Sequence, residues 1–239
     1  MKTIKLKYHI EALNLIGHVP SISEQALTEL NELKNIIDFI PESMYEFYSL
    51  KNSIELISYQ DCLFSIPRII RNIDRFLKND MLIFMTENQS VVDWAIRLDG
   101  SDDPEVLVGD KNKIEEKDKW IVYIDSFTNF IFTQIFDWKY IFGTPYVLQA
   151  GYKPSTDDLT FLMQEFNSGP RTYGWPGDIN YRFYNELGGI IIHGNWWWLG
   201  ASNGVKLKKL TKLVWNCGGL KDELWGNTEQ SIAILEEIK

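Results

Sequence analysis

The sequence predicts an α+β fold in which helices pack on a mainly antiparallel sheet, and three observations support this prediction. Apolar residues recur at 3-, 4- and 7-residue spacing over 26–37, which is typical of an amphipathic helix. Over 91–98 apolar and polar positions alternate instead, as they do in strands. Three β-prone runs over 181–201 are separated by the turns Gly188-Gly189 and Gly194-Asn195, which favour an antiparallel meander.

The first third of the chain is predicted to be mostly helical. Ser21 and Glu24 fit a capping box that begins the first helix. Pro41 is expected to begin a second helix. Proline has no backbone N–H, and the first position of a helix does not need one. The expected elements are a helix over 26–37, a helix over 41–50, a strand over 54–59 and an amphipathic helix over 67–77.

The middle third is predicted to form the sheet. Met81–Met85 is a continuous apolar run and Val91–Leu98 alternates, so the two are expected to form a hairpin around the turn at 86–90. Further strands are expected over 105–108 and 120–124, followed by a helix over 126–137 that Ser126 caps.

The last third is predicted to be a β-rich extension. Punctuation by Gly143, Pro145, Gly151 and Pro154 indicates a linker. We therefore expect a domain over 1–150 and an extension over 151–239 that could be part of the same fold. The elements expected in the extension are a helix over 157–167, the meander strands 181–184, 190–193 and 196–201, and a helix over 205–215.

Composition narrows the class of function. The chain has 239 residues, 45% of them hydrophobic, which excludes a disordered protein. The formal net charge is −9, so direct binding of nucleic acid is not expected. Residues 81–170 carry 7 basic and 15 acidic side chains, and their net charge of −8 accounts for nearly all of the negative charge of the chain.

The same sequence offers no signature of catalysis. Only two cysteines are present and they are far apart, which is typical of a reducing compartment. Polar residues interrupt each apolar run, so we expect no secretory signal, no membrane span and a cytoplasmic location. The three histidines are also far apart, and no nucleotide-binding or hydrolase motif occurs. We predict no catalytic residue, no cofactor and no metal site.

One series of motifs resembles a known family. The series is Ile40-Pro41-Glu42-Ser43-Met44-Tyr45-Glu46-Phe47-Tyr48, then Leu82-Ile83-Phe84-Met85-Thr86-Glu87-Asn88-Gln89, Trp94, Asp103-Pro104-Glu105-Val106, and Trp120 before Ser126-Phe127. In order and spacing it resembles the SUKH superfamily, the domains related to the Smi/Knr-type regulator of cell-wall synthesis, over roughly residues 20–140. Where that family often has an Asn-Gly-Gly-like turn after the second helix, this chain has Asn52-Ser53-Ile54.

The resemblance implies a non-catalytic immunity protein whose partner is a cognate polymorphic or contact-dependent toxin. An acidic surface suits a basic nuclease toxin, because opposite charges accelerate capture. The candidate partner-binding residues are the acids of loops 99–105 and 110–118: Asp99, Asp102, Asp103, Glu105, Asp110, Glu115, Glu116 and Asp118.

Two alternatives remain open. The first is a carbohydrate- or peptide-binding scaffold module whose binding face contains Trp175, Trp196, Trp197 and Trp198. Alternation on a strand places Trp196 and Trp198 on one face and Trp197 on the other. The second is an enzyme of unrecognised type, which only the surplus of carboxylates supports.

Overall fold

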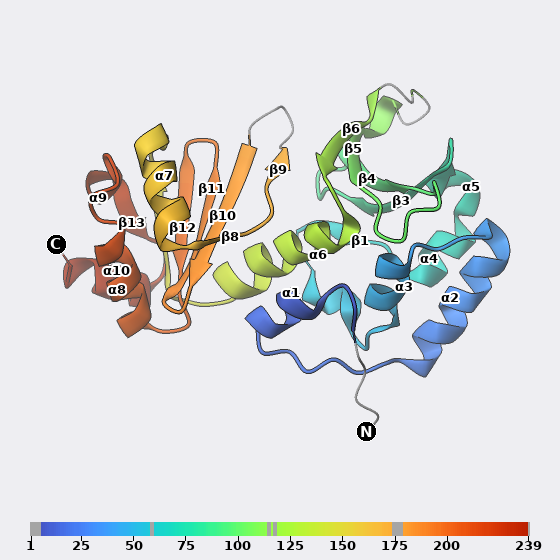
Figure 1. Cartoon of the computed structure of the whole chain (residues 1–239), viewed down its shortest axis with the longest axis horizontal. Helices are drawn as coiled ribbons and strands as arrows, with labels where there is room; N and C mark the ends of the chain where they lie inside the picture. Colours follow the sequence, from blue (N-terminus) through green and yellow to red (C-terminus); the bar gives the residue numbers. More distant parts are fainter. Residues whose placement is uncertain (1–5, 58–59, 114–115, 117–118, 174–178, 239) are drawn as a thin grey trace. The chain divides into compact units, whose positions relative to one another are not determined.

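The chain folds into two compact units, Met1–Ile135 and Phe136–Lys239. The computed structural model describes residues 6–57, 60–113, 116, 119–173 and 179–238 (Figure 1). Each unit contains helices and its own antiparallel sheet, so the predicted α+β class is confirmed. The division falls at residue 135, earlier than the predicted boundary at 150.

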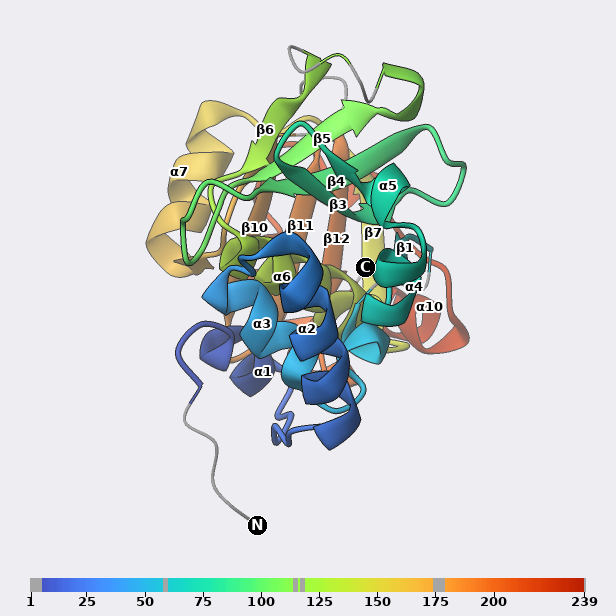
Figure 2. The same cartoon turned by 90° about the vertical axis from the view of Figure 1, so that its right-hand side faces the viewer.

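The first unit is a meander sheet with helices on one side. Its sheet has the order β1-β3-β4-β5-β6, and β2 pairs with β3. Figures 1 and 2 show α2, α3 and α6 on one side of this sheet. The elements are α1 (Ile10–Leu15), α2 (Glu24–Ile37), α3 (Glu42–Ser49), a 3₁₀ turn (Ser53–Leu56), β1 (Cys62–Leu63), α4 (Ile66–Arg71), α5 (Ile73–Phe76), β2 (Leu77–Lys78), β3 (Met81–Thr86), β4 (Val92–Arg97), β5 (Val106–Asp110), a 3₁₀ turn (Lys111–Lys113), β6 (Ile121–Ile124) and α6 (Phe127–Ile135).

Aromatic side chains join α6 to the sheet of the first unit. The ring of Phe84 on β3 meets the rings of Phe127 and Phe130 edge-on, with centroids 5.3 Å away in each case. All three side chains are fully buried. Edge-to-face pairs of this kind add about 0.5–1.5 kcal/mol beyond the burial of their area. Helix α6 is therefore fixed against the sheet, and the loops that precede it are fixed with it.

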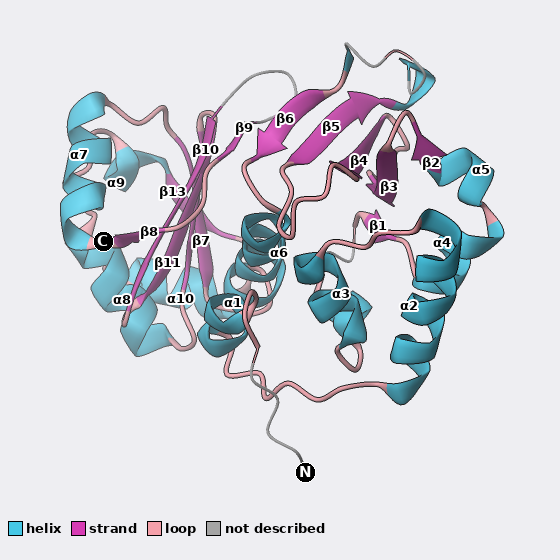
Figure 3. Ribbon diagram, turned by 45° about the vertical axis from the view of Figure 1, so that its right-hand side comes forward, coloured by secondary structure: helices cyan, strands magenta, loops and turns pink. Residues whose placement is uncertain are grey.

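The second unit begins where α6 passes into a π-helical turn, Phe136–Ile141. Its sheet has the order β13-β7-β12-β11-β10-β8, and β9 pairs with β10. Figure 3 shows α7, α8 and α9 on one side of this sheet. The elements are β7 (Val147–Gly151), α7 (Thr156–Glu165), β8 (Asn167–Ser168), β9 (Thr172–Tyr173), β10 (Ile179–Asn185), β11 (Gly188–His193), β12 (Trp196–Gly200), α8 (Gly204–Leu213), α9 (Leu220–Glu223), β13 (Leu224–Gly226) and α10 (Glu229–Glu236).

The predicted boundary at 150 is wrong because β7 belongs to the second sheet. Strand β7 pairs with β12 on one side and with β13 on the other. The segment 143–154 therefore contains a central strand, and its glycines and prolines flank that strand instead of forming a linker. The extension has its own core around Trp197, Leu199 and Leu210.

Several local predictions also change. Ser23, not Ser21, caps α2, since its side chain accepts the N–H of Ala26 at 3.2 Å. The expected helix 67–77 is two helices that meet at Asn72. The expected strand 54–59 is a 3₁₀ turn over Ser53–Leu56, and residues 58–59 lie outside the described residues. Asn52 has a positive φ of 60°, a conformation that asparagine tolerates in turns.

Candidate functional site

The acidic loop 99–105 joins β4 to β5 and carries two outward-facing carboxylates. Asp99 and Asp102 are both exposed. One oxygen of Asp99 accepts the N–H of Ser101 at 3.0 Å, which fixes the turn and leaves the charge in solvent. The backbone carbonyl of Asp102 accepts the N–H of Ser43 at 2.9 Å. The loop is therefore attached to the start of α3 through its backbone, and the Asp102 carboxylate is not used in that contact.

The other two acids of this loop have partners inside the unit. A carboxylate oxygen of Asp103 accepts the N–H of Thr128 at 2.9 Å, in the first turn of α6. A negative group is favourable there because the helix N-terminus carries partial positive charge. Glu105 forms an ion pair with Arg97, with 3.2 Å between Oε1 and Nε. Asp103 and Glu105 therefore hold the loop, while Asp99 and Asp102 are available to a partner.

The second predicted acidic loop lies at the opposite end of β5. Asp110 accepts the N–H of Asn112 at 2.9 Å, and Glu116 is exposed. Glu115 and Asp118 lie outside the described residues. Three lysines interrupt the four acids of segment 110–118, whereas loop 99–105 has four acids and no basic residue. Asp110 is therefore separated from loop 99–105 by the length of β5, and 99–105 is the more negative of the two segments in sequence.

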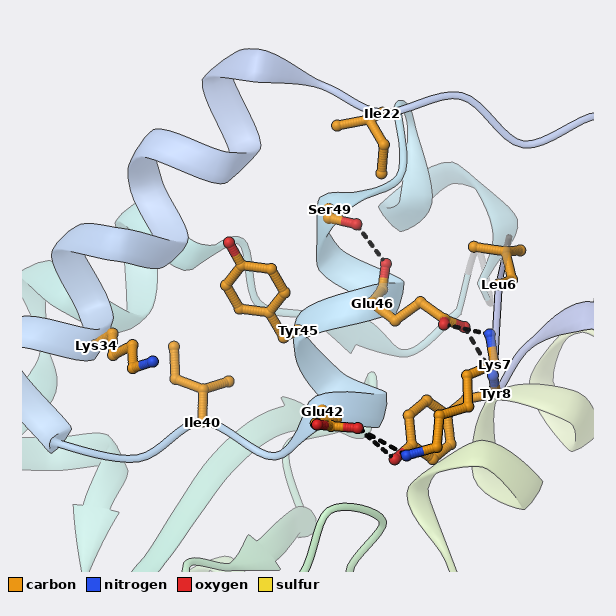
Figure 4. A pocket seen from close by; sticks show the side chains of 10 residues that line it. All are labelled: Leu6, Lys7, Tyr8, Ile22, Lys34, Ile40, Glu42, Tyr45, Glu46 and Ser49. Carbon is orange, nitrogen blue, oxygen red and sulfur yellow. Dashed lines mark hydrogen bonds and ion pairs between the residues drawn. The ribbon is translucent and has the colours of Figure 1, made fainter. Parts of the chain in front are cut away.

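A groove of about 440 Å³ follows the exposed side of α3 (Figure 4). Glu42, Tyr45, Glu46 and Ser49 form a stripe along the helix, because residues three and four apart share a helical face. Figure 4 shows Lys34 and Ile40 on one side of this stripe and the segment Leu6–Tyr8 on the other. The full lining is Leu6, Lys7, Tyr8, Ile22, Lys34, Ile40, Glu42, Tyr45, Glu46 and Ser49.

Two glutamates on α3 bind the N-terminal segment. The carboxylate of Glu46 accepts the backbone N–H groups of Lys7, Tyr8 and His9 at 2.6, 3.0 and 3.1 Å. Glu42 accepts the Lys7 ammonium at 2.8 Å and the Tyr8 hydroxyl at 2.9 Å. These two bonds, the one from Lys7 first, hold the pKa of Glu42 below its usual value. The segment therefore forms one fixed wall of the groove.

His9 is a buried histidine beneath this wall. Its Nε2 lies 2.8 Å from the carbonyl oxygen of Ser43, and its Nδ1 has no hydrogen-bond partner. The rings of Phe47 and Phe127 lie 5.5 and 6.1 Å from the imidazole, centroid to centroid. Burial lowers the pKa of His9, although the Ser43 carbonyl and the charges of Glu46 and Asp103 oppose this shift. The imidazole is therefore neutral at pH 7 and donates from Nε2 to Ser43.

We expect His9 to make the protein sensitive to acid. A histidine whose pKa is lowered on folding contributes stability that is complete above its unfolded pKa of about 6.5 and is lost as the pH falls through the folded value. Each unit of lowering corresponds to about 1.4 kcal/mol. Urea unfolding at pH 7.5 and 5.0 measures the effect. His9→Phe should lower the free energy of unfolding by the same amount at both pH values, so its free energy should fall less between pH 7.5 and 5.0 than that of the wild type. An equal fall in both proteins would contradict the assignment.

The predicted tryptophan face lies on the second sheet and is smaller than predicted. Trp196 has 48% of its surface exposed, and its ring meets that of Trp225 edge-on at 5.8 Å. Trp198 shares the face of Trp196, and the centroid of its ring lies 5.8 Å from that of Phe142. Trp197 points to the opposite face and is completely buried, so its inclusion in a binding face was wrong. Its indole N–H donates to the carbonyl of Tyr152 at 2.8 Å.

Trp175 lies outside the described residues. Within the described ranges, no group of three or more His, Cys, Asp or Glu side chains is placed to hold a metal ion. Among the same residues, no helix combines the length and the apolar character needed to cross a bilayer.

Sequence reasoning missed the groove and the glutamates that shape it. The four-residue spacing of Glu42 and Glu46 was readable as one face of the helix 41–50. Their partners Lys7 and Tyr8 are more than 30 residues away, and no local pattern connects the two segments.

Comparisons with known proteins add no assignment at this point. No protein-family model, no curated protein and no solved structure matches the chain.

Proposed function

We propose that this protein binds and neutralises a basic protein toxin, possessing no catalytic activity of its own, and that it acts in the cytoplasm as an immunity protein. The order of motifs that resembles the SUKH superfamily supports the proposal, as does the arrangement of helices on an antiparallel meander in the first unit. Neutralisation is by occlusion, in which the bound protein covers the toxin's basic surface.

The observation that carries the proposal is the acidic loop 99–105. Four acids follow one another there without a basic residue, and Asp99 and Asp102 face solvent. Asp125 adjoins the loop, because it follows Ile124 of β6, which pairs with Val106 at the start of β5. Because Asp103 is bonded to α6 and the Asp102 backbone to α3, the loop is held in one conformation. A fixed cluster of negative charge accelerates the encounter with a positively charged partner.

Charge reversal at the loop tests the proposal. The probe is the protein encoded by the neighbouring reading frame, with its association measured by stopped flow and its neutralisation by growth of cells that express both. Asp99→Lys with Asp102→Lys should lower the association rate constant about tenfold to a hundredfold at low ionic strength, with the difference shrinking in high salt. Growth rescue should weaken in parallel.

The matched control carries the same change in net charge on the second unit. Glu186→Lys with Asp222→Lys alters two exposed acids that are remote in sequence from the loop. It should change the rate constant far less than the loop variant. Equal effects of the two variants, or a neighbouring product that neither binds nor is toxic, would contradict the proposal.

A glycan-binding module is the second candidate function. The exposed Trp196 ring, braced edge-on by Trp225, favours it, because a flat aromatic surface stacks on the apolar face of a sugar ring. Gly151 lies beside Trp196 and leaves this part of the sheet face flat. Titrating Trp196→Ala and the wild type with soluble glycans tests this candidate, since only the wild type should change its tryptophan fluorescence.

A further inference from the structure

We infer that the groove along α3 receives a single large apolar side chain from a basic segment of the partner protein. This inference rests on the proposed function and names the part of the partner that the site recognises. It joins two features of the first unit that are contiguous in the structure, namely the groove and the acidic loop 99–105.

The contact between the two features is direct. Glu42 lines the groove at the start of α3, and the next residue, Ser43, donates its N–H to the carbonyl of Asp102 in the loop. Asp103 lies close enough to His9, beneath the groove wall, for its charge to act on the imidazole. A peptide that binds over the loop at Asp102 therefore lies next to the Glu42 end of the groove.

The floor of the groove is suited to an apolar group. Ile22, Ile40 and Tyr45 present hydrocarbon to it, and Leu6 closes one side. Glu46 uses both of its oxygens on the N–H groups of residues 7–9, so it forms part of the wall instead of binding a ligand. A volume of about 440 Å³ is within the usual range of ligand pockets, roughly 300–1,000 Å³, and accommodates one aromatic or leucine side chain.

The charges around the groove determine how the occupant is oriented. The acidic loop 99–105 meets the groove at its Glu42 end, because Asp102 accepts the N–H of Ser43, and Lys7 at that end is already paired with Glu42. Figure 4 shows Lys34 on the other side of the α3 stripe from Lys7. Lys34 forms no ion pair within the described part of the chain. The positive residues of the occupant therefore lie over the acidic loop, and its apolar side chain fills the groove. A buried anchor beside a charged rim is the usual arrangement of an interface hot spot.

Three synthetic peptides test the inference. The first has one phenylalanine flanked on its N-terminal side by four lysines. The second replaces the phenylalanine with serine, and the third replaces the lysines with glutamates. Fluorescence anisotropy with the full-length protein should give at least tenfold weaker binding for the second peptide, because loss of an aromatic anchor removes its burial. The third peptide should bind weakest, because its charge opposes that of the loop.

Two protein variants assign the binding to the groove. Tyr45→Ala should weaken the first peptide about tenfold and leave the second unchanged, with circular dichroism recording whether the variant folds. Lys34→Glu changes an exposed residue and should tighten the first peptide severalfold, because it removes a repelling cation. Equal affinity for the first two peptides, or weaker binding to Lys34→Glu, would overturn the inference.

These outcomes separate the inference from the proposed function. If the neighbouring gene product is neutralised but the peptides do not distinguish phenylalanine from serine, the groove inference fails and the proposed function stands. If the first peptide binds the groove but the neighbouring gene product is not bound, the proposed function fails.

Discussion

Replacing Asp137 with alanine is expected to destabilise the second unit by about 3–5 kcal/mol. Asp137 lies in the π-helical turn and forms two parallel bonds with Arg182 on β10, at 2.8 Å to Nε and 2.6 Å to Nη2. The Arg182 side chain is only 3% exposed, and that of Asp137 is 17% exposed. Arg182 also donates to Thr172 at 3.3 Å and to the Pro170 carbonyl at 3.4 Å. Without Asp137, a buried guanidinium loses a carboxylate that it contacts through two hydrogen bonds.

The double variant Asp137→Leu, Arg182→Leu is the control. Replacing both charges with apolar side chains of similar size is often close to neutral, since no unpaired charge remains. Seven of the nine tryptophans lie in residues 136–239, so urea unfolding followed by tryptophan fluorescence reports mainly on the second unit. The single variant should unfold at much lower urea than the double variant. Similar midpoints for the two would show that the ion pair is not responsible.

Replacing Glu46 with alanine is expected to cost about 2–3 kcal/mol and to release the segment Lys7–His9. One carboxylate accepts three consecutive backbone N–H groups there, and bonds to a charged acceptor are stronger than neutral ones. The backbone N–H of His9 is partly buried, so water does not fully replace the carboxylate acceptor that it loses. Amide hydrogen exchange at residues 7–9 measures the release directly.

Two further variants locate the source of this effect. Glu46→Gln keeps one acceptor oxygen without the charge and should give an intermediate loss. Glu42→Gln removes the charge that pairs with Lys7 on the exposed side of the same helix, and it should leave exchange at His9 nearly unchanged. Fast exchange at His9 in Glu42→Gln, or slow exchange in Glu46→Ala, would contradict the role assigned to Glu46.

The sheets were the most predictable part of the fold. Alternation over Val91–Leu98 predicted β4, and the structure pairs it antiparallel with β3. β10, β11 and β12 form the expected meander, with the predicted turn at Gly194-Asn195. Gly188 and Gly189 instead begin β11, and the turn before them is Glu186-Leu187. These patterns are local, because β-prone runs that flank a short turn are close in sequence to the strands with which they pair.

Elements that depend on distant residues were not predictable. Strand β7 consists of Val147–Gly151, and its place is set by partners more than 40 residues away, so its glycine and the nearby prolines indicated a linker instead. Strand β13 and helix α10 were missed for the same reason. The run 54–59 is β-prone, but the positive φ of Asn52 begins a 3₁₀ turn that keeps Ser53 and Leu56 buried.

The candidate site was predictable in part. Charge counting identified loop 99–105, and Asp99 and Asp102 are exposed there. It did not separate these two acids from Asp103 and Glu105, because a count of charges does not show which carboxylate bonds to Thr128 or Arg97. Strand alternation correctly placed Trp196 and Trp198 opposite Trp197, but the buried side of the sheet became clear only from its packing.

The pairing of β13 with β7 has a consequence during synthesis on the ribosome. Strand β7 is the first strand of the second unit and β13 is the last, and Ser231 in α10 also bonds to the N–H of Val147 at 3.1 Å. The first unit has all of its strands and helices once residue 135 has emerged, whereas β7 must wait for a partner strand that is translated more than 70 residues later. Nascent chains halted between the two would therefore expose one edge of β7, and a molecular chaperone is expected to engage them there.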